Sequence, residues 1–184
     1  MSRAFPGFCA IALTAALLAG CAREQPRRPA PTVPPPYATP RAPPPAAGAI
    51  SPAAYVEQAS SIDLYEIRSS QLALQRSANK RVQEFASMMV QAHRGTSSQL
   101  SFAGRRLNLL PSAKLLPKHQ ALVDALQSAP NFDALYRQQQ VAVHSEAAAL
   151  HAGYAAHGTS PTLRPVAQTI LPIVQRHQRL LRYL

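Results

Sequence analysis

The sequence predicts an all-α fold for residues 51–184: an antiparallel four-helix bundle with one extra short helix. Apolar side chains recur in this region at three- and four-residue steps, which is the spacing of one face of an α-helix. Proline is sparse here, although the whole chain contains 18 prolines. Strand-like alternation and hairpin dipeptides such as Asn-Gly are not found in the sequence. About 130 residues suffice for one domain with a single core.

Capping residues and apolar stripes place the first two helices. Ser51 and Pro52 suit an N-cap and a first helical position, so a helix is predicted over residues 52–76. A second helix is predicted to begin near Ser77 or Asn79 and to end at Arg105 and Arg106. The inner positions are expected to be Tyr55, Ala59, Ile62, Glu66, Ser69 and Ala73 in the first helix, and Val82, Ala86, Met89, His93, Thr96, Leu100 and Ala103 in the second.

A connection, a short helix and two longer helices are predicted to follow. Residues 107–116 are expected to be a connection, residues 117–128 a short helix, and residues 131–158 a long helix. The last helix is predicted to open at Ser160-Pro161, and Pro172 inside it is expected to kink it because proline has no N–H to donate. The expected inner positions are Tyr136, Gln140, Val143, Ala147, Leu150 and Tyr154, with His144 at the border, and then Val166, Ile170, Ile173, Val174, His177, Leu180 and Leu181.

The first 50 residues predict export and lipid attachment. Arg3 precedes the uncharged run 4–18, which is shorter than the roughly 20 residues that span a bilayer. The segment Leu18-Ala19-Gly20-Cys21 resembles the lipobox of bacterial lipoproteins, in which the chain is cut before an acylated cysteine. The resemblance implies a signal peptide over residues 1–20 and a protein anchored by lipid on Cys21 to a membrane of the bacterial envelope. It implies the periplasmic face, and Ala22 favours the outer membrane.

Residues 21–50 are expected to be a disordered tether after the acylated cysteine. Proline density is high and large apolar side chains are almost missing, so the segment cannot bury enough surface to fold. Of the two cysteines, Cys9 lies in the signal peptide and Cys21 is the lipid site. The predicted domain therefore has no thiol, which excludes disulfides, thiolate catalysis and cysteine metal sites there.

Several helical motifs resemble one family. They are Glu66, the run Met88–His93, the segment Phe132–Tyr136 with His144 eight residues on, and Leu171-Pro172 followed by His177. Together they are similar to a family of bacterial envelope proteins of unknown function that is classed as ferritin-like and often described as outer-membrane proteins. The resemblance implies a ferritin-like bundle. That family usually has Asp-His where this chain has Ala92-His93, so the aspartate next to the histidine is missing here.

Glu66, His93, His144 and His177 are the candidate metal ligands, one on each long helix. In ferritin-like bundles such inward groups bind metals, and imidazole with carboxylate suits iron, manganese, zinc or copper. A di-iron site is not expected, because Val90 and Val141 stand where a Glu-x-x-His step would need a carboxylate. A single transition-metal ion is one hypothesis. The other, preferred from the sequence, is a hydrogen-bonded core network, such as a neutral histidine with Glu66. His119, His151 and His157 are expected at exposed or rim positions.

The charge points to an anionic partner. The formal net charge is +11, but nucleic acid is not expected for an exported chain without aromatic side chains among its basic residues. Anionic envelope polymers and phospholipid headgroups fit better, beside the alternative of a generally basic surface. Motifs of hydrolases, phosphate-binding loops and zinc proteases are not found. The sequence therefore favours a non-catalytic binding or structural module over an enzyme, with metal storage or stress protection as the alternative.

Overall fold

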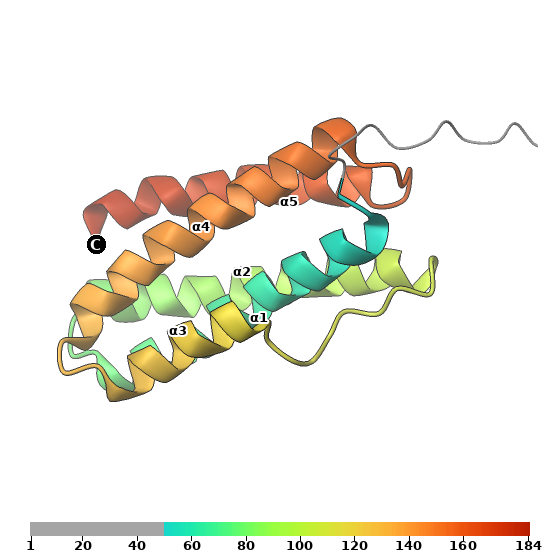
Figure 1. Cartoon of the computed structure of the whole chain (residues 1–184). Helices are drawn as coiled ribbons and strands as arrows, with labels where there is room; N and C mark the ends of the chain where they lie inside the picture. The colour runs from blue at the N-terminus through green and yellow to red at the C-terminus, as the bar shows by residue number, and fades with distance from the viewer. Residues whose placement is uncertain (1–49) are drawn as a thin grey trace, which may run out of the picture. The chain divides into compact units, whose positions relative to one another are not determined.

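The computed structural model describes residues 50–184, and over this range it is an all-α fold of five helices and one short 3-10 helix, with no strand (Figure 1). The predicted signal peptide, the predicted lipid site Cys21 and the predicted tether lie outside the described residues. Within those residues, no helix is long and apolar enough to cross a membrane. The elements are α1 (Pro52–Arg76), α2 (Lys80–Arg105), α3 (Pro117–Ser128), α4 (Phe132–His157), α5 (Arg164–Leu180) and η1 (Leu181–Tyr183).

Side-chain caps fix the starts of three helices close to the predicted residues. The Ser51 hydroxyl accepts the Ala54 N–H at 3.2 Å. Asn79 accepts the backbone N–H two residues on, and Asn131 accepts the one three residues on, at 3.0 and 3.4 Å. Each contact satisfies a backbone donor that the first helical turn leaves free. Gly158 ends α4, where its N–H donates to the Tyr154 carbonyl at 2.8 Å.

The last helix begins later than predicted. Ser160 caps a turn rather than a helix, since its hydroxyl accepts the Leu163 N–H at 3.3 Å and α5 starts only at Arg164. The reason is a second proline: Pro165 has no N–H, so it cannot donate to the carbonyl four residues earlier and the regular ladder is interrupted there. Helix α5 continues through Pro172, and the kink at that residue stays a prediction.

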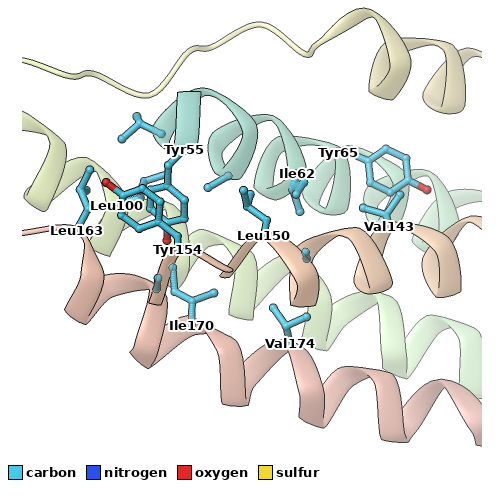
Figure 2. Close-up of a cluster of buried hydrophobic side chains, with 14 of the residues drawn as sticks. Tyr55, Ile62, Tyr65, Leu100, Val143, Leu150, Tyr154, Leu163, Ile170 and Val174 are labelled. Atoms are coloured by element: carbon cyan, nitrogen blue, oxygen red, sulfur yellow. The ribbon is translucent and has the colours of Figure 1, made fainter. Parts of the chain in front are cut away.

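The helices pack as two pairs that share a core. Helix α1 packs along α2 and α4 along α5, while α1 also contacts α3 and α4, and α2 contacts α5. In the core shown in Figure 2, the rings of Tyr55 and Tyr154 stack with their centroids 3.9 Å apart, which joins α1 to α4. All the inner positions predicted for α1, α2 and α4 are buried. The antiparallel four-helix arrangement in detail and the ferritin-like class stay predictions.

Two histidines expected at the surface are buried, so that prediction was wrong. His119 and His151 are 0% and 3% exposed, while His157 is exposed as expected. His119 Nδ1 lies 2.7 Å from the hydroxyl of Ser61, and His151 Nδ1 lies 3.0 Å from that of Tyr55. Helix spacing explains the second case, because a residue seven positions after His144 returns to nearly the same inner face.

The end of α2 requires a residue without a side chain. The Gly104 carbonyl accepts the N–H groups of Leu107 and Leu109, both at 2.9 Å. Asn108 between them has φ 56°, in the left-handed region. A Cβ on Gly104 would lie 2.1 Å from the Leu109 carbonyl oxygen. The tight turn therefore folds the connection back onto the last turn of α2 and fixes where the following leucines lie.

We expect Gly104→Ala to lower the free energy of unfolding by about 1–3 kcal/mol, because backbone atoms must move to admit the methyl group. Gly95→Ala is the matched control. Gly95 is an exposed helical position where an added Cβ meets nothing within 4 Å, so alanine should stabilise the domain by about 0.5–1 kcal/mol. Urea denaturation measures both, and equal effects of the two substitutions would contradict the tight turn.

Burial of His151 should make the domain sensitive to acid. Burial lowers the pKa of His151 to about 4, so the unfolded chain binds this proton more readily than the folded one between about pH 6.5 and 4. Stability is therefore lost as the pH falls through that window. The variant His151→Gln keeps an acceptor for Tyr55 but cannot be protonated. It should reduce the loss of unfolding free energy between about pH 7 and 4.5 by roughly 2 kcal/mol. The same substitution at exposed His157 should leave the loss unchanged.

Candidate metal centre

Three histidines from three helices converge inside the domain. His93 of α2, His144 of α4 and His177 of α5 are 2%, 0% and 3% exposed. Each can offer one ring nitrogen such that the three nitrogens lie within 4.8 Å of one another. The helical stripes explain the convergence, because all three residues lie on inner faces that pack around the same core. One comes from the α1–α2 pair and two from the α4–α5 pair.

His93 is oriented by a buried carboxylate of the neighbouring helix. Its Nδ1 lies 2.8 Å from Oδ1 of Asp63 on α1. The hydroxyls of Thr96 and Ser97 donate to the same carboxylate at 2.7 and 3.1 Å. An ionised carboxylate accepts hydrogen bonds, so His93 holds a proton on Nδ1, and in the neutral ring Nε2 carries the lone pair. This Nε2 is buried and has no hydrogen-bond partner among residues 50–184.

His144 is held in the matching orientation by its own helix. Its Nδ1 donates to the Gln140 carbonyl at 2.9 Å, which leaves Nε2 with a lone pair. That Nε2 lies 3.3 Å from Nδ1 of His177. Two lone pairs at this distance repel, so either His177 carries its proton on Nδ1 and donates, or a cation lies between the nitrogens. Both a hydrogen-bonded pair and a metal site fit this geometry.

Glu66 lies beside the histidines rather than between them. It is fully buried, and its Oε1 is 3.3 Å from His144 Nδ1. That is the ring nitrogen on the side away from His177. Neither carboxylate oxygen makes a hydrogen bond within the described part of the chain, and burial raises the pKa of Glu66 to about 7. The structure thus brings all four predicted residues together, with the three histidines forming a triangle of ring nitrogens and Glu66 at its edge.

The local electrostatics favour neutral imidazoles on two of the three histidines. Burial lowers the pKa of His144 well below its usual value and that of His177 to about 3, and the charge of His93 adds to both effects. For His93, burial alone would lower the pKa, but the hydrogen bond and charge of Asp63, with the charge of Glu66, raise it. Metal binding needs unprotonated nitrogens. The lowered pKa values favour them on His144 and His177, whereas at His93 a metal ion would compete with a proton for Nε2.

The sequence reasoning did not identify Asp63. It stands three residues before Glu66, so the two carboxylates share one side of α1. Asp63 was outside the predicted inner stripe, yet it is 4% exposed. The three-residue spacing between Asp63 and Glu66 is the sequence signal that could have placed Asp63 near the site. The aspartate that the resembling family usually has next to the histidine is Ala92 here, and in this structure a carboxylate from another helix orients His93.

A second cluster joins a buried serine and a buried histidine to a partly exposed carboxylate, but it lacks an accessible nucleophile. Ser61 Oγ lies 2.7 Å from His119 Nδ1, and His119 Nε2 lies 3.4 Å from Glu146. Ser61 is 1% exposed, and its hydroxyl also accepts the Leu116 N–H at 2.8 Å. The cluster therefore ties the connection before α3 to α1.

Comparison with solved structures shows the fold. CopM in the Cu(II)-bound form is 14% identical over 73% of this chain and 95% of its own, with a TM-score of 0.62. A DUF305 fragment from Deinococcus radiodurans is 18% identical over 76% of this chain and 96% of its own, with a TM-score of 0.58. At these identities the likeness concerns the helical fold alone.

No curated protein matches the chain. The family model described as a domain of unknown function, DUF4142, matches residues 37–184. This confirms the expectation of a domain-of-unknown-function family. Because the match spans the whole described domain and most of the chain, this protein belongs to the DUF4142 family.

Proposed function

We propose that this protein binds a single transition-metal ion through His93, His144 and His177. The observation that supports it best is the convergence of three buried ring nitrogens within 4.8 Å. A buried polar atom without a partner costs about 1–3 kcal/mol, and His93 Nε2 is such an atom within residues 50–184. A metal ion would use this nitrogen. A core network without metal leaves it unpaired, and for this reason the metal hypothesis now ranks above the structural one.

The ligand set favours copper or zinc. Imidazole nitrogens suit both ions, and Cu(II) binds a given nitrogen site more tightly than the other divalent first-row metals. CopM, whose fold is similar, has been solved with Cu(II) bound, which makes copper the first ion to test. His93 would bind through Nε2 with Asp63 behind its other nitrogen, the carboxylate–histidine–metal pattern of protein metal sites. Glu66 is the fourth candidate ligand, and it would have to shift to take part.

The role that fits this site is binding rather than catalysis. All three histidines are at most 3% exposed, so a bound ion would be held away from solvent and from other molecules. Holding a redox-active ion in this way would store it or prevent its side reactions. An exported, lipid-anchored protein would do so in the cell envelope.

Metal analysis tests this proposal. The chain from Ala22 to Leu184, purified without a histidine tag and equilibrated with Cu(II) or Zn(II), should contain about one ion per chain. His93→Ala and His177→Ala should contain none. His157→Ala removes an exposed histidine of α4 and should keep the ion. Circular dichroism checks that each variant is folded, and a folded wild type without metal would make the histidines structural.

Asp63 should set the affinity of the site. Replacing a partner that orients a metal-binding histidine typically weakens binding 10–100-fold, so we expect Asp63→Asn to raise the dissociation constant for Cu(II) by roughly that factor. Asp124→Asn, a change of the same charge at an exposed residue of α3, is the control. Competition with a chromogenic chelator measures both. Equal affinities for Asp63→Asn and wild type would mean that the carboxylate only stabilises the fold.

We also propose that Cys21 anchors the protein to an envelope membrane and that its basic surface contacts anionic envelope polymers. The lipobox-like residues 18–21 and the net charge of +11 support this. In cells, the wild type should fractionate with membranes, and intact-mass spectrometry should find acyl chains on an N-terminal Cys21. Cys21→Ala should remain uncleaved and unacylated. An unmodified, soluble wild type would contradict the anchor, independently of any result on metal.

A further inference from the structure

One end of the domain combines exposed apolar side chains with basic ones. We call it the loop end; it comprises the last turn of α2, the connection 106–116 and the first turns of α1 and α5. Two grooves show that these parts adjoin: one is lined by Ala53 and Leu110, the other by Phe102 and Pro165. In Figure 1 the start of α1, the beginning of this connection and the start of α5 lie at the same end, away from the C-terminus.

The apolar side chains at the loop end are unusually exposed. Phe102 and Leu110 are each 70% exposed, and across the described residues only Tyr183 is more exposed among large hydrophobic residues. The connection itself is rich in leucine, with Leu107, Leu109, Leu115 and Leu116 besides Leu110. The other four leucines are half-buried against the domain. Leu110 is thus held outward by a connection that the tight turn at Gly104 fixes.

The charges around these residues have one sign. Arg105, Arg106, Lys114 and Arg164 are all exposed there. The sequence has no aspartate or glutamate between Glu84 and Asp124, and none after Glu146. Glu57, which lines the groove beside Leu110, is the acidic residue of α1 at this end. Basic side chains next to exposed Phe and Leu are the composition of protein surfaces that lie in the headgroup region of anionic bilayers.

We propose that the loop end docks onto an anionic phospholipid bilayer, with Phe102 and Leu110 inserted among the headgroups and the four cations on lipid phosphates. Charge complementarity selects this partner, because each such cation near an anionic surface strengthens binding by a factor of about five. The chain also enters the domain at this end, since α1 begins there. This surface is separate from the metal centre and does not depend on it.

Single tryptophans report the docking directly, because the chain contains no tryptophan. Phe102→Trp and Leu110→Trp are made in the unacylated chain 22–184, so that neither signal peptide nor lipid contributes. With phosphatidylglycerol vesicles, both should shift their emission to the blue and be quenched by brominated acyl chains. With phosphatidylcholine vesicles the shift should be weak. Val141→Trp, at a half-exposed position of α4, should not shift with either vesicle.

Binding constants from vesicle co-sedimentation test the charges. Arg105→Gln/Arg106→Gln should weaken binding to phosphatidylglycerol vesicles by roughly 25-fold, as the product of two factors of about five. Phe102→Ser/Leu110→Ser should weaken it by roughly tenfold or more through lost apolar burial. The matched control is Arg179→Gln/Arg182→Gln, two exposed arginines near the C-terminus, which should change binding less than twofold. Raising the salt concentration should weaken wild-type binding.

Three results would overturn the proposal. The first is no binding of the wild type to phosphatidylglycerol vesicles. The second is an equal loss in the C-terminal arginine control, which would show attraction by net charge without a defined surface. The third is a blue shift of the Phe102→Trp or Leu110→Trp variant with soluble polyphosphate but not with vesicles, which would assign the surface to a polyanion. Thermal melting of each variant distinguishes lost docking from lost folding.

Discussion

The hydrogen bond between Asp63 and His93 is the interaction on which the rest of the centre depends. It joins α1 to α2 at 2.8 Å in a site where both side chains are almost completely buried. Removing one partner of such a buried pair typically costs about 3–5 kcal/mol, because the other charge stays buried without compensation. The same bond engages Nδ1 of His93 and so leaves Nε2 as the nitrogen available to a shared site with His144 and His177. The contact between α1 and α2 therefore determines which nitrogen of His93 is available to the histidines of α4 and α5.

The centre is polar but only partly satisfied by the protein itself. His144 and His177 approach each other to 3.3 Å, and both have lowered pKa values because burial opposes their charged forms. Neither Glu66 oxygen nor His93 Nε2 has a hydrogen-bond partner within residues 50–184. Buried polar groups in native proteins are rarely left in this condition without a functional reason. An ion bound only by the folded state would also stabilise it by mass action and would link the α1–α2 pair to the α4–α5 pair.

Helical periodicity and caps were enough to predict most of the fold. The bounds of α1 and α3 agree with the structure, and the buried faces of α1, α2 and α4 contain every residue predicted for them. The predicted start of α5 was too early, because the prediction relied on the cap at Ser160 and did not include the backbone N–H that Pro165 lacks. His119 was misplaced because its burial depends on how α3 packs against α1, and a twelve-residue helix gives little periodicity from which to infer its inner face.

The site could be predicted only as a set of residues. Stripe positions identified Glu66, His93, His144 and His177, but which ring nitrogens face one another depends on contacts between helices. Asp63 shows the limit, since it lies off the apolar stripe and is buried because its partners His93, Thr96 and Ser97 come from α2.

The proposed metal centre and the proposed docking surface would impose different requirements on the same helices. Around His93, a metal site would need α2 to be rigid and closely packed, because ligand nitrogens need fixed positions. At its C-terminal end α2 instead exposes Phe102 to solvent and ends in the tight turn at Gly104. His93 and Phe102 are separated by about two and a half turns of α2, and each residue advances the helix by only about 1.5 Å. A docked loop end would therefore hold the centre at a fixed, short distance from the bilayer.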